Sequence, residues 1–165
     1  MNDTKFAIGI LVSNHFGVLL KVVGLFSRRG FNIDSLTVGE TQNPDLSRIT
    51  IVSSGDEHVQ DQIVHQLEKL FDVKKVEVMD PHNTVHRELI LVKISMVGIK
   101  RSDVLEAVNV FRAKVVDYNL DSITVEITGE NSKLQAFVEY VNQFGVIEMT
   151  RTGITAMGRN NSCLK

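Results

Sequence analysis

A short polar segment between two apolar ones offers groups that could bind a small anion. Residues 13–17, Ser-Asn-His-Phe-Gly, follow the apolar run 6–12 and precede apolar residues at helical spacing. The pattern predicts a helix that begins at about Gly17. The first N–H groups of a helix have no intrahelical partner and carry partial positive charge. This end therefore suits a carboxylate, and we expect the side chains of Asn14 and Asn32 beside it.

The same polar residues also fit a simpler interpretation. Asn and Gly are common in turns because they tolerate left-handed backbone conformations. Asn14 and Gly17 could therefore serve only to turn the chain, and Asn32 could serve only to end a loop before a strand. From residue types alone, the ligand site and the plain turn both stay open.

Other chemically capable groups lack partners at a suitable spacing. His15 has no Ser, Cys or carboxylate spaced to form a nucleophile–base pair with it. His82, His86 and Glu88 suggest a metal site. However, Pro81 disfavours the helix that would bring both imidazoles to one face. We therefore predict no catalytic residue and no metal site in this chain.

The composition is that of a soluble globular chain with one or two small domains. It has 165 residues, of which 43% are hydrophobic, and a formal net charge of -2. Lys and Arg are spread along the chain, so we expect no nucleic-acid partner. The single Cys163 fits a reducing compartment. Because the N-terminal apolar run is short and no cleavage site follows it, we expect no signal peptide, no membrane span and a cytoplasmic location.

The chain contains one pattern twice: strand, helix, strand, strand, helix, strand. Runs of β-branched residues and 3.6-residue spacing place these elements. In the first copy, strands are predicted at about 5–12, 32–40, 47–54 and 73–79, and helices at about 17–29 and 56–70. In the second copy, strands are predicted at about 87–97, 115–119, 122–128 and 146–157, and helices at about 102–113 and 131–143.

Each copy predicts a ferredoxin-like sandwich, in which two helices cover one face of a four-stranded antiparallel sheet. The expected fold class is α+β, with two tandem ferredoxin-like βαββαβ domains. We expect the domains at residues 1–80 and 81–165, with a linker at about 80–86 and a polar tail at 158–165. In this topology the strand at 32–40 lies at a sheet edge, where it is apolar enough to pair with a second chain.

Several runs in the sequence resemble one family. In the first half these are Asn14-x-x-Gly17-Val18-Leu19, GLFSRRGFNIDSLTV at 24–38 and LSRITI at 46–51. They resemble the ACT domain of the regulatory small subunit of acetohydroxyacid synthase, also called acetolactate synthase. In the second half, RELILVK at 87–93 and VFRA at 110–113 are similar to the C-terminal domain of that family. The resemblance covers nearly the whole chain, and GFNIDSLTV at 30–38 is more specific than a generic ACT domain.

The resemblance implies a non-catalytic subunit. Such a subunit joins a large catalytic subunit that carries thiamine diphosphate, Mg and FAD, and raises its activity. It also makes the enzyme sensitive to feedback by valine or another branched-chain amino acid in isoleucine and valine biosynthesis. No cofactor is expected on this chain. Family members bind the effector between two ACT domains, which implies a homodimer through these domains.

The resemblance and the residue types together predict an effector site. Backbone N–H groups at the helix start would receive the effector's carboxylate, and the two Asn side-chain oxygens would accept from its ammonium. Two aliphatic residues, with residues of the facing protomer, would hold its side chain. A methylene there is worth only ~1–3 kcal/mol, so selectivity among valine, leucine and isoleucine should be modest. The predicted effector-binding residues are Asn14, Gly17, Val18, Leu19, Asn32 and Ile33.

The second copy lacks these polar residues. Aligned by eye, it has Ile99, Ser102 and Asp117 where the first copy has Asn14, Gly17 and Asn32. We therefore predict that the effector site belongs to the first domain only, and that the second domain serves interactions.

Three other functions are compatible with a ferredoxin-like fold, and the sequence argues against two of them. An RNA-recognition module needs exposed aromatic residues on its central strands, and the strand at 47–54 has none. A small enzyme would need a positioned acid, base or nucleophile, which the loops do not offer. A stand-alone ACT-type amino-acid sensor coupled to another enzyme or regulator stays open, because an effector site alone does not say what it regulates.

Overall fold

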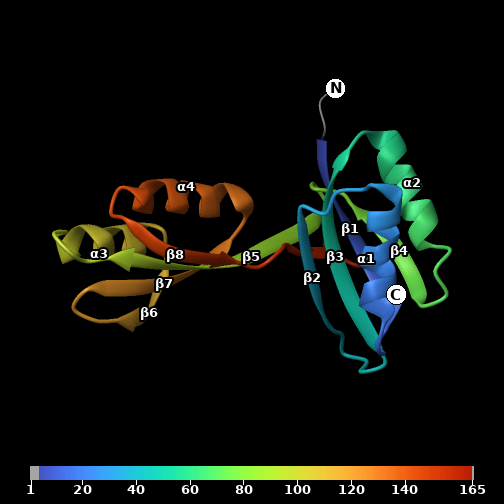
Figure 1. The fold of residues 1–165 in the computed structure, drawn as a ribbon, viewed down its shortest axis with the longest axis horizontal. Coiled ribbons are helices and arrows are strands. Elements are labelled where there is room, and N and C mark those ends of the chain that lie inside the picture. The colour runs from blue at the N-terminus through green and yellow to red at the C-terminus, as the bar shows by residue number, and fades with distance from the viewer. Residues whose placement is uncertain (1–3, 165) are drawn as a thin grey trace. The chain divides into compact units, whose positions relative to one another are not determined.

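The structure is a computed structural model that describes residues 4–164 in two compact units. Unit 1 consists of residues 4–86 and 153–164, and unit 2 of Arg87–Thr152. Each unit contains a βαββαβ arrangement with an antiparallel sheet (Figure 1). The predicted fold class, two tandem ferredoxin-like domains, is confirmed. None of the helices described here has the length and apolar character needed to cross a membrane.

Unit 1 begins with six elements in the expected order. Its strands pair in the order β2-β3-β1-β4, and α1 and α2 pack through one core on the same face of this sheet (Figure 1). Ile8 and Ile10 of β1 face that core. Ala7, which precedes Ile8 in the strand, faces the opposite side of the sheet. The elements are β1 (Thr4–Ser13), α1 (Val18–Arg29), β2 (Ser35–Glu40), β3 (Leu46–Gly55), α2 (Glu57–Leu67) and β4 (Val73–Met79).

Glycines set both ends of α1. Gly17 precedes the helix with φ 86°, and Gly30 ends it with φ 71°. These left-handed conformations are open to glycine at no steric cost. The apolar face between them buries Val22 and Phe26 completely. In the structure, α1 therefore begins within one residue of the start that the sequence predicted.

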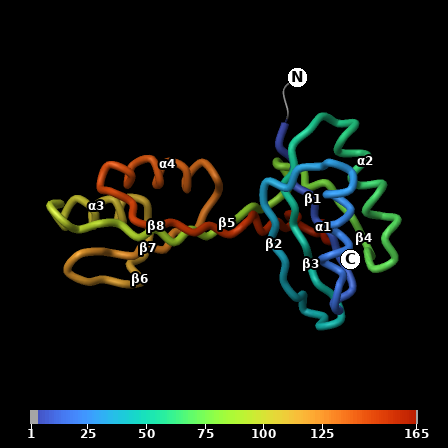
Figure 2. Tube along the Cα trace, in the orientation of Figure 1, coloured from blue at the N-terminus to red at the C-terminus, as the bar shows by residue number. Residues whose placement is uncertain are grey.

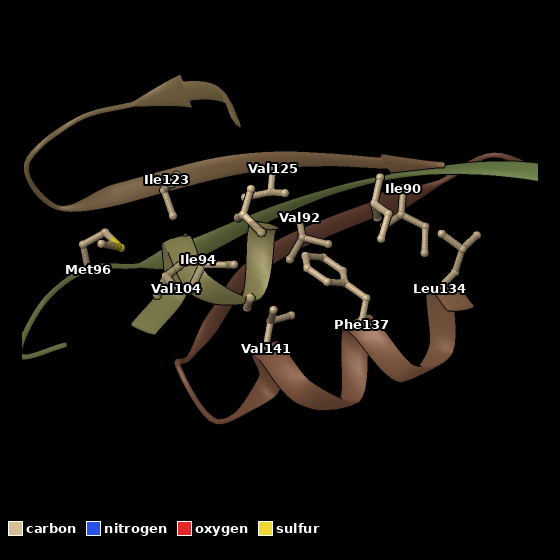
Figure 3. Packing of buried hydrophobic residues seen from close by; sticks show 13 residues of the cluster. Ile90, Val92, Ile94, Met96, Val104, Ile123, Val125, Leu134, Phe137 and Val141 are labelled. Carbon is tan, nitrogen blue, oxygen red and sulfur yellow. The ribbon is translucent and has the colours of Figure 1, made fainter. Parts of the chain in front are cut away.

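Unit 2 repeats the arrangement, with strand order β6-β7-β5-β8. Leu134, Phe137 and Val141 of α4 are fully buried and point toward the strands (Figure 3). The strand β5 begins in unit 1 and continues into unit 2. The elements are β5 (Thr84–Ser95), α3 (Arg101–Val110), β6 (Lys114–Tyr118), β7 (Ser122–Gly129), α4 (Asn131–Asn142) and β8 (Val146–Arg151).

The C-terminal segment 153–164 differs from its prediction. The sequence analysis expected one strand at 146–157 and a solvated tail in the second domain. Instead β8 ends at Arg151, and β9 (Thr155–Gly158) pairs with β5 and belongs to unit 1. Figure 2 shows the red C-terminal trace running on from β8 into the strands of unit 1. Ala156 is buried against Ala7 and Met79, in a cluster separate from the core beneath the helices. These apolar residues need cover, which this segment supplies.

The tail beyond β9 is also packed. Leu164 is buried, and its side chain lies beside Gly9 of β1. Cys163 is exposed, as expected, and its carbonyl oxygen accepts a hydrogen bond from Lys75 Nζ at 3.4 Å. The expectation of a wholly solvated tail is therefore wrong, because one apolar residue in a polar sequence is enough to anchor it.

Two other boundaries differ. The linker predicted at 80–86 is shorter, because a turn at Asp80 is followed at once by β5 from Thr84. The strand predicted at 32–40 begins only at Ser35. Before it, the Asn32 side chain donates to Asp34, and Ser53 Oγ donates to the Asn32 carbonyl at 2.6 Å. These local side-chain bonds compete with the strand ladder.

Candidate functional site

The loop 14–17 leads into a helix start without a side-chain cap. Gly17 is the N-cap of α1, no side chain bonds to this end, and its first turn contains no acidic residue. Val18 N–H reaches only the His15 carbonyl at 3.4 Å, and Gly17 N–H donates to none of the residues described. The starts of α3 and α4 also lack a side-chain cap, whereas the N-cap Asp56 of α2 accepts from Val59 N–H at 2.9 Å. The start of α1 therefore has backbone donors of the kind that bind anions at other helix starts.

Asn14 fixes the loop against the connection between β2 and β3. Its Nδ2 donates to Glu40 Oε1 at 3.1 Å and to the Pro44 carbonyl at 2.8 Å, and its N–H donates to the Asp45 carbonyl at 2.7 Å. These bonds leave the side-chain oxygen of Asn14 as an acceptor. The residue is therefore a structural anchor of the loop, and its Oδ1 accepts no hydrogen bond from the residues described.

A buried carboxylate holds the other side of the loop. Asp72 lies between α2 and β4, and accepts from Lys21 Nζ at 2.7 Å and from His15 Nε2 at 2.9 Å. The hydrogen bond from Lys21 holds the pKa of Asp72 below its ordinary value, with a smaller contribution from His15, against an opposing effect of desolvation. The sequence analysis missed Asp72, since nothing in the local pattern distinguishes it from a solvated loop aspartate.

Asn32 lies at the opposite end of the sheet from Gly17. Asn14 follows Ser13, which pairs with Leu46 of β3, whereas Asn32 bonds to Ser53 at the far end of that strand. At about 3.3 Å per residue, these ends are separated by roughly 20 Å. The expectation that both Asn side chains lie beside the same helix start is therefore wrong within a single chain.

The predicted apolar residues have different surroundings. Val18 is buried in the unit 1 core, so only its N–H faces the loop. Leu19 is 38% exposed on α1 and could contact a ligand. Ile33 is half-buried against the core at the same end as Asn32. One chain thus brings together Asn14, Gly17, Val18 and Leu19, but not Asn32 and Ile33.

No metal site is apparent within residues 4–164, where no group of three or more His, Cys, Asp and Glu side chains could hold an ion. Glu88, one of the residues considered, is buried and paired with Arg151 of β8. His82 lies in the turn that Asp80 caps.

The corresponding loop of unit 2 presents other groups. The N-cap of α3 is Lys100, so Lys100, and not the Ser102 of the sequence alignment, is the structural counterpart of Gly17. Three residues earlier, Val97 corresponds to Asn14 and is 70% exposed. The alignment by eye was therefore shifted by two residues. The counterparts are nevertheless a cation and an aliphatic side chain, so the amide of the first loop has no equivalent there.

Comparison with known proteins resolves the family. Residues 8–75 match the family model described as the AHAS small subunit-like ACT domain, and residues 87–160 match the model for the small subunit of acetolactate synthase. The chain belongs to the acetolactate synthase small-subunit family. It is 46% identical over 162 residues to a protein named probable acetolactate synthase small subunit from Methanothermobacter thermautotrophicus, covering 98% of this chain and 96% of that one.

Other relatives of this family agree. The acetolactate synthase small subunit of Mycobacterium bovis is 43% identical over 159 residues, covering 96% of this chain and 95% of that one. The crystal structure of the acetolactate synthase small subunit from Thermotoga maritima has a TM-score of 0.89 and 42% identity, and covers 96% of this chain and 99% of that one. Membership makes the chain a regulatory subunit, not a catalytic one, and confirms the resemblance stated from its sequence.

Proposed function

We propose that this chain activates the thiamine-diphosphate catalytic subunit of acetolactate synthase and confers feedback inhibition by a branched-chain amino acid, in the cytoplasm. The observation that carries the effector part is the uncapped start of α1 at Gly17, with Asn14 beside it, in an ACT domain of this family. Mg and FAD, like thiamine diphosphate, would be held by the catalytic subunit. Biosynthesis of isoleucine and valine would then be controlled by its own products.

Two chains together would complete the effector site. The strand β2 is at the edge of its sheet and pairs only with β3 among the strands described. If two copies pair β2 antiparallel about a two-fold axis through the middle of this strand, Ser35 of one chain opposes the partner's Glu40. Because Asn14 bonds to Glu40 within each chain, this pairing brings Asn32 of one chain near the partner's Asn14. A homodimer would thus join residues that a single chain separates.

The assembled groups suit a zwitterionic amino acid. The Gly17 N–H, which has no partner among the residues described, and the Val18 N–H, whose only bond is the 3.4 Å one to His15, would bind the carboxylate. The Asn14 oxygen with the partner's Asn32 would accept from the ammonium. Leu19 of one chain and the partner's Ile33 would contact an aliphatic side chain. All six predicted residues keep their roles, provided that the site is shared by two chains.

The direct test replaces Gly17 and measures regulation in the reconstituted holoenzyme. An aspartate at this position would place a carboxylate against the effector's carboxylate, so Gly17→Asp should abolish inhibition by valine, leucine and isoleucine while activation remains. Gly17→Asn is the matched control, because Asn and Asp both tolerate a left-handed backbone and a Cβ meets nothing within 4 Å there. Loss of activation with inhibition retained would contradict the proposal.

The same experiment separates the remaining alternative. If the chain binds a branched-chain amino acid but neither activates nor associates with a catalytic subunit of acetolactate synthase, the stand-alone sensor is the better description.

A further inference from the structure

The carboxylate of Asp72 contacts residues on both sides of Gly17 in the loop 14–17 and the start of α1, which we call the effector loop. It accepts from His15 Nε2 at 2.9 Å and from Lys21 Nζ at 2.7 Å, while the Asp72 backbone carbonyl accepts from Ser13 N–H at 2.9 Å. Ser13 ends β1, His15 lies in the loop, and Lys21 lies in the first turn of α1. The three contacts therefore bracket Gly17 along the chain.

We propose that Asp72 is a positioning residue for the effector site, which fixes the loop 14–17 and so aims the N–H groups at the start of α1. The inference rests on the proposed function, because it concerns the regulation of that same site. Asp72 would not touch the effector itself. It would act through His15 and Lys21, by reducing the number of loop conformations that binding must restrict.

Burial shows which member of this cluster depends on the others. The Asp72 side chain is 6% exposed, whereas His15 and Lys21 are 53% and 56% exposed. The exposed side chains of His15 and Lys21 can be hydrated without Asp72, but the buried carboxylate depends on its donors. The contacts therefore draw the loop toward Asp72 and hold it there.

The aromatic residues in the loop 14–17 and next to Asp72 do not fix these segments by apolar packing. Phe16, next to His15, and Phe71, next to Asp72, are 102% and 91% exposed. Neither aromatic ring anchors its loop to the unit 1 core. Besides the bonds made by Asn14 on the β2–β3 side, the polar contacts to Asp72 are what the structure offers to hold this loop.

The test compares effector affinity among variants of the full chain by calorimetry with valine, leucine and isoleucine. Asp72→Asn keeps the shape but removes the charge, and should weaken binding about tenfold, as expected for one charge-assisted hydrogen bond. Lys21→Met should also weaken binding, and Lys21→Arg should restore it. Because His15 acts through Asp72, adding His15→Ala to Asp72→Asn should cause no further loss. A merely structural role would not produce this rescue and non-additivity.

A destabilised control excludes general loss of stability. Asp56→Ala removes the N-cap of α2 without touching the loop, so it should lower stability and leave the affinity unchanged. Retained affinity in Asp72→Asn, or an equal loss in Asp56→Ala, would overturn this inference and leave the proposed function standing. No binding by the unaltered chain, alone or with its catalytic subunit, would overturn both.

Discussion

The loop before α1 and the loop before α3 occupy equivalent places in two units of the same topology, yet they present different groups. Both helix starts lack a side-chain cap. The first has Gly17 at the N-cap, three residues after the amide of Asn14. The second has the cation Lys100 at the N-cap and the exposed Val97 in place of the amide. The comparison teaches that the fold supplies the helix start, and that a few loop residues decide which chemical groups surround it.

The largest expected effect is the loss of stability on truncating a core phenylalanine. It tests whether the two units have similar cores but different functions. Phe26 in unit 1 and Phe137 in unit 2 are both fully buried. Truncating either to alanine should cost roughly 3–5 kcal/mol of stability. Urea unfolding monitored by residue-resolved NMR should show the loss in the unit that carries the change. Effector binding should disappear in Phe26→Ala and persist in Phe137→Ala; its loss in both would show that the units do not function separately.

The next effect addresses the two loops directly. Gly17→Asp should weaken effector binding by about a hundredfold or more, since like charges would meet at a helix start. Lys100→Asp, the same carboxylate at the equivalent N-cap of unit 2, should change the affinity less than twofold. Calorimetry of both variants with valine, leucine and isoleucine gives the answer. A strong effect of Lys100→Asp would place effector chemistry in the second unit.

A smaller effect probes the segment 153–164, which covers the sheet of unit 1. A Cβ at Gly153 would lie 2.5 Å from Thr37 Oγ1 and 3.0 Å from the Leu36 backbone, whereas a Cβ at Gly39 of the same strand meets nothing within 4 Å. Gly153→Ala should therefore cost about 1–3 kcal/mol, and Gly39→Ala about 0.5 kcal/mol or less. Denaturant midpoints measure both. Equal midpoints would mean that the segment does not pack on β2 in solution.

The smallest effect is a pH dependence that arises in unit 1. Hydrogen bonds from Ser54, then from Lys5 and Asn32, lower the pKa of Asp34, and hydrogen bonds from Lys21 and His15 lower that of Asp72. Both carboxyls are thus easier to ionise in the folded state, so their contribution is present above their ordinary pKa of 3.8 and is lost as the pH falls below it. Asp72→Asn and Asp34→Asn should flatten the decline in urea midpoint between pH 5 and 3. An unchanged slope in both would contradict these contacts.

Much of the fold could be predicted because its signals are local. The spacing of apolar residues and the glycines at Gly17 and Gly30 predicted α1 closely. The prediction of one strand at 146–157 was wrong. Its two parts, β8 and β9, have similar residue types and differ in what they pack against. The predicted beginning of β2 was wrong, because the strand starts only at Ser35. The Asp34 N–H already donates to the Val52 carbonyl at 2.8 Å, whereas the side chain of Asn32 bonds locally to Asp34.

The sequence by itself determined the family, the two-copy fold and the groups at the start of α1, since these depend on residue types and short-range spacing. Only the tertiary structure decided that Asp72 bonds to Lys21 and His15, because these partners are 51 and 57 positions away along the chain. It likewise decided that Asn32 and Asn14 lie at opposite ends of one sheet. Strand direction and register fix that separation, and neither can be derived from residue types alone.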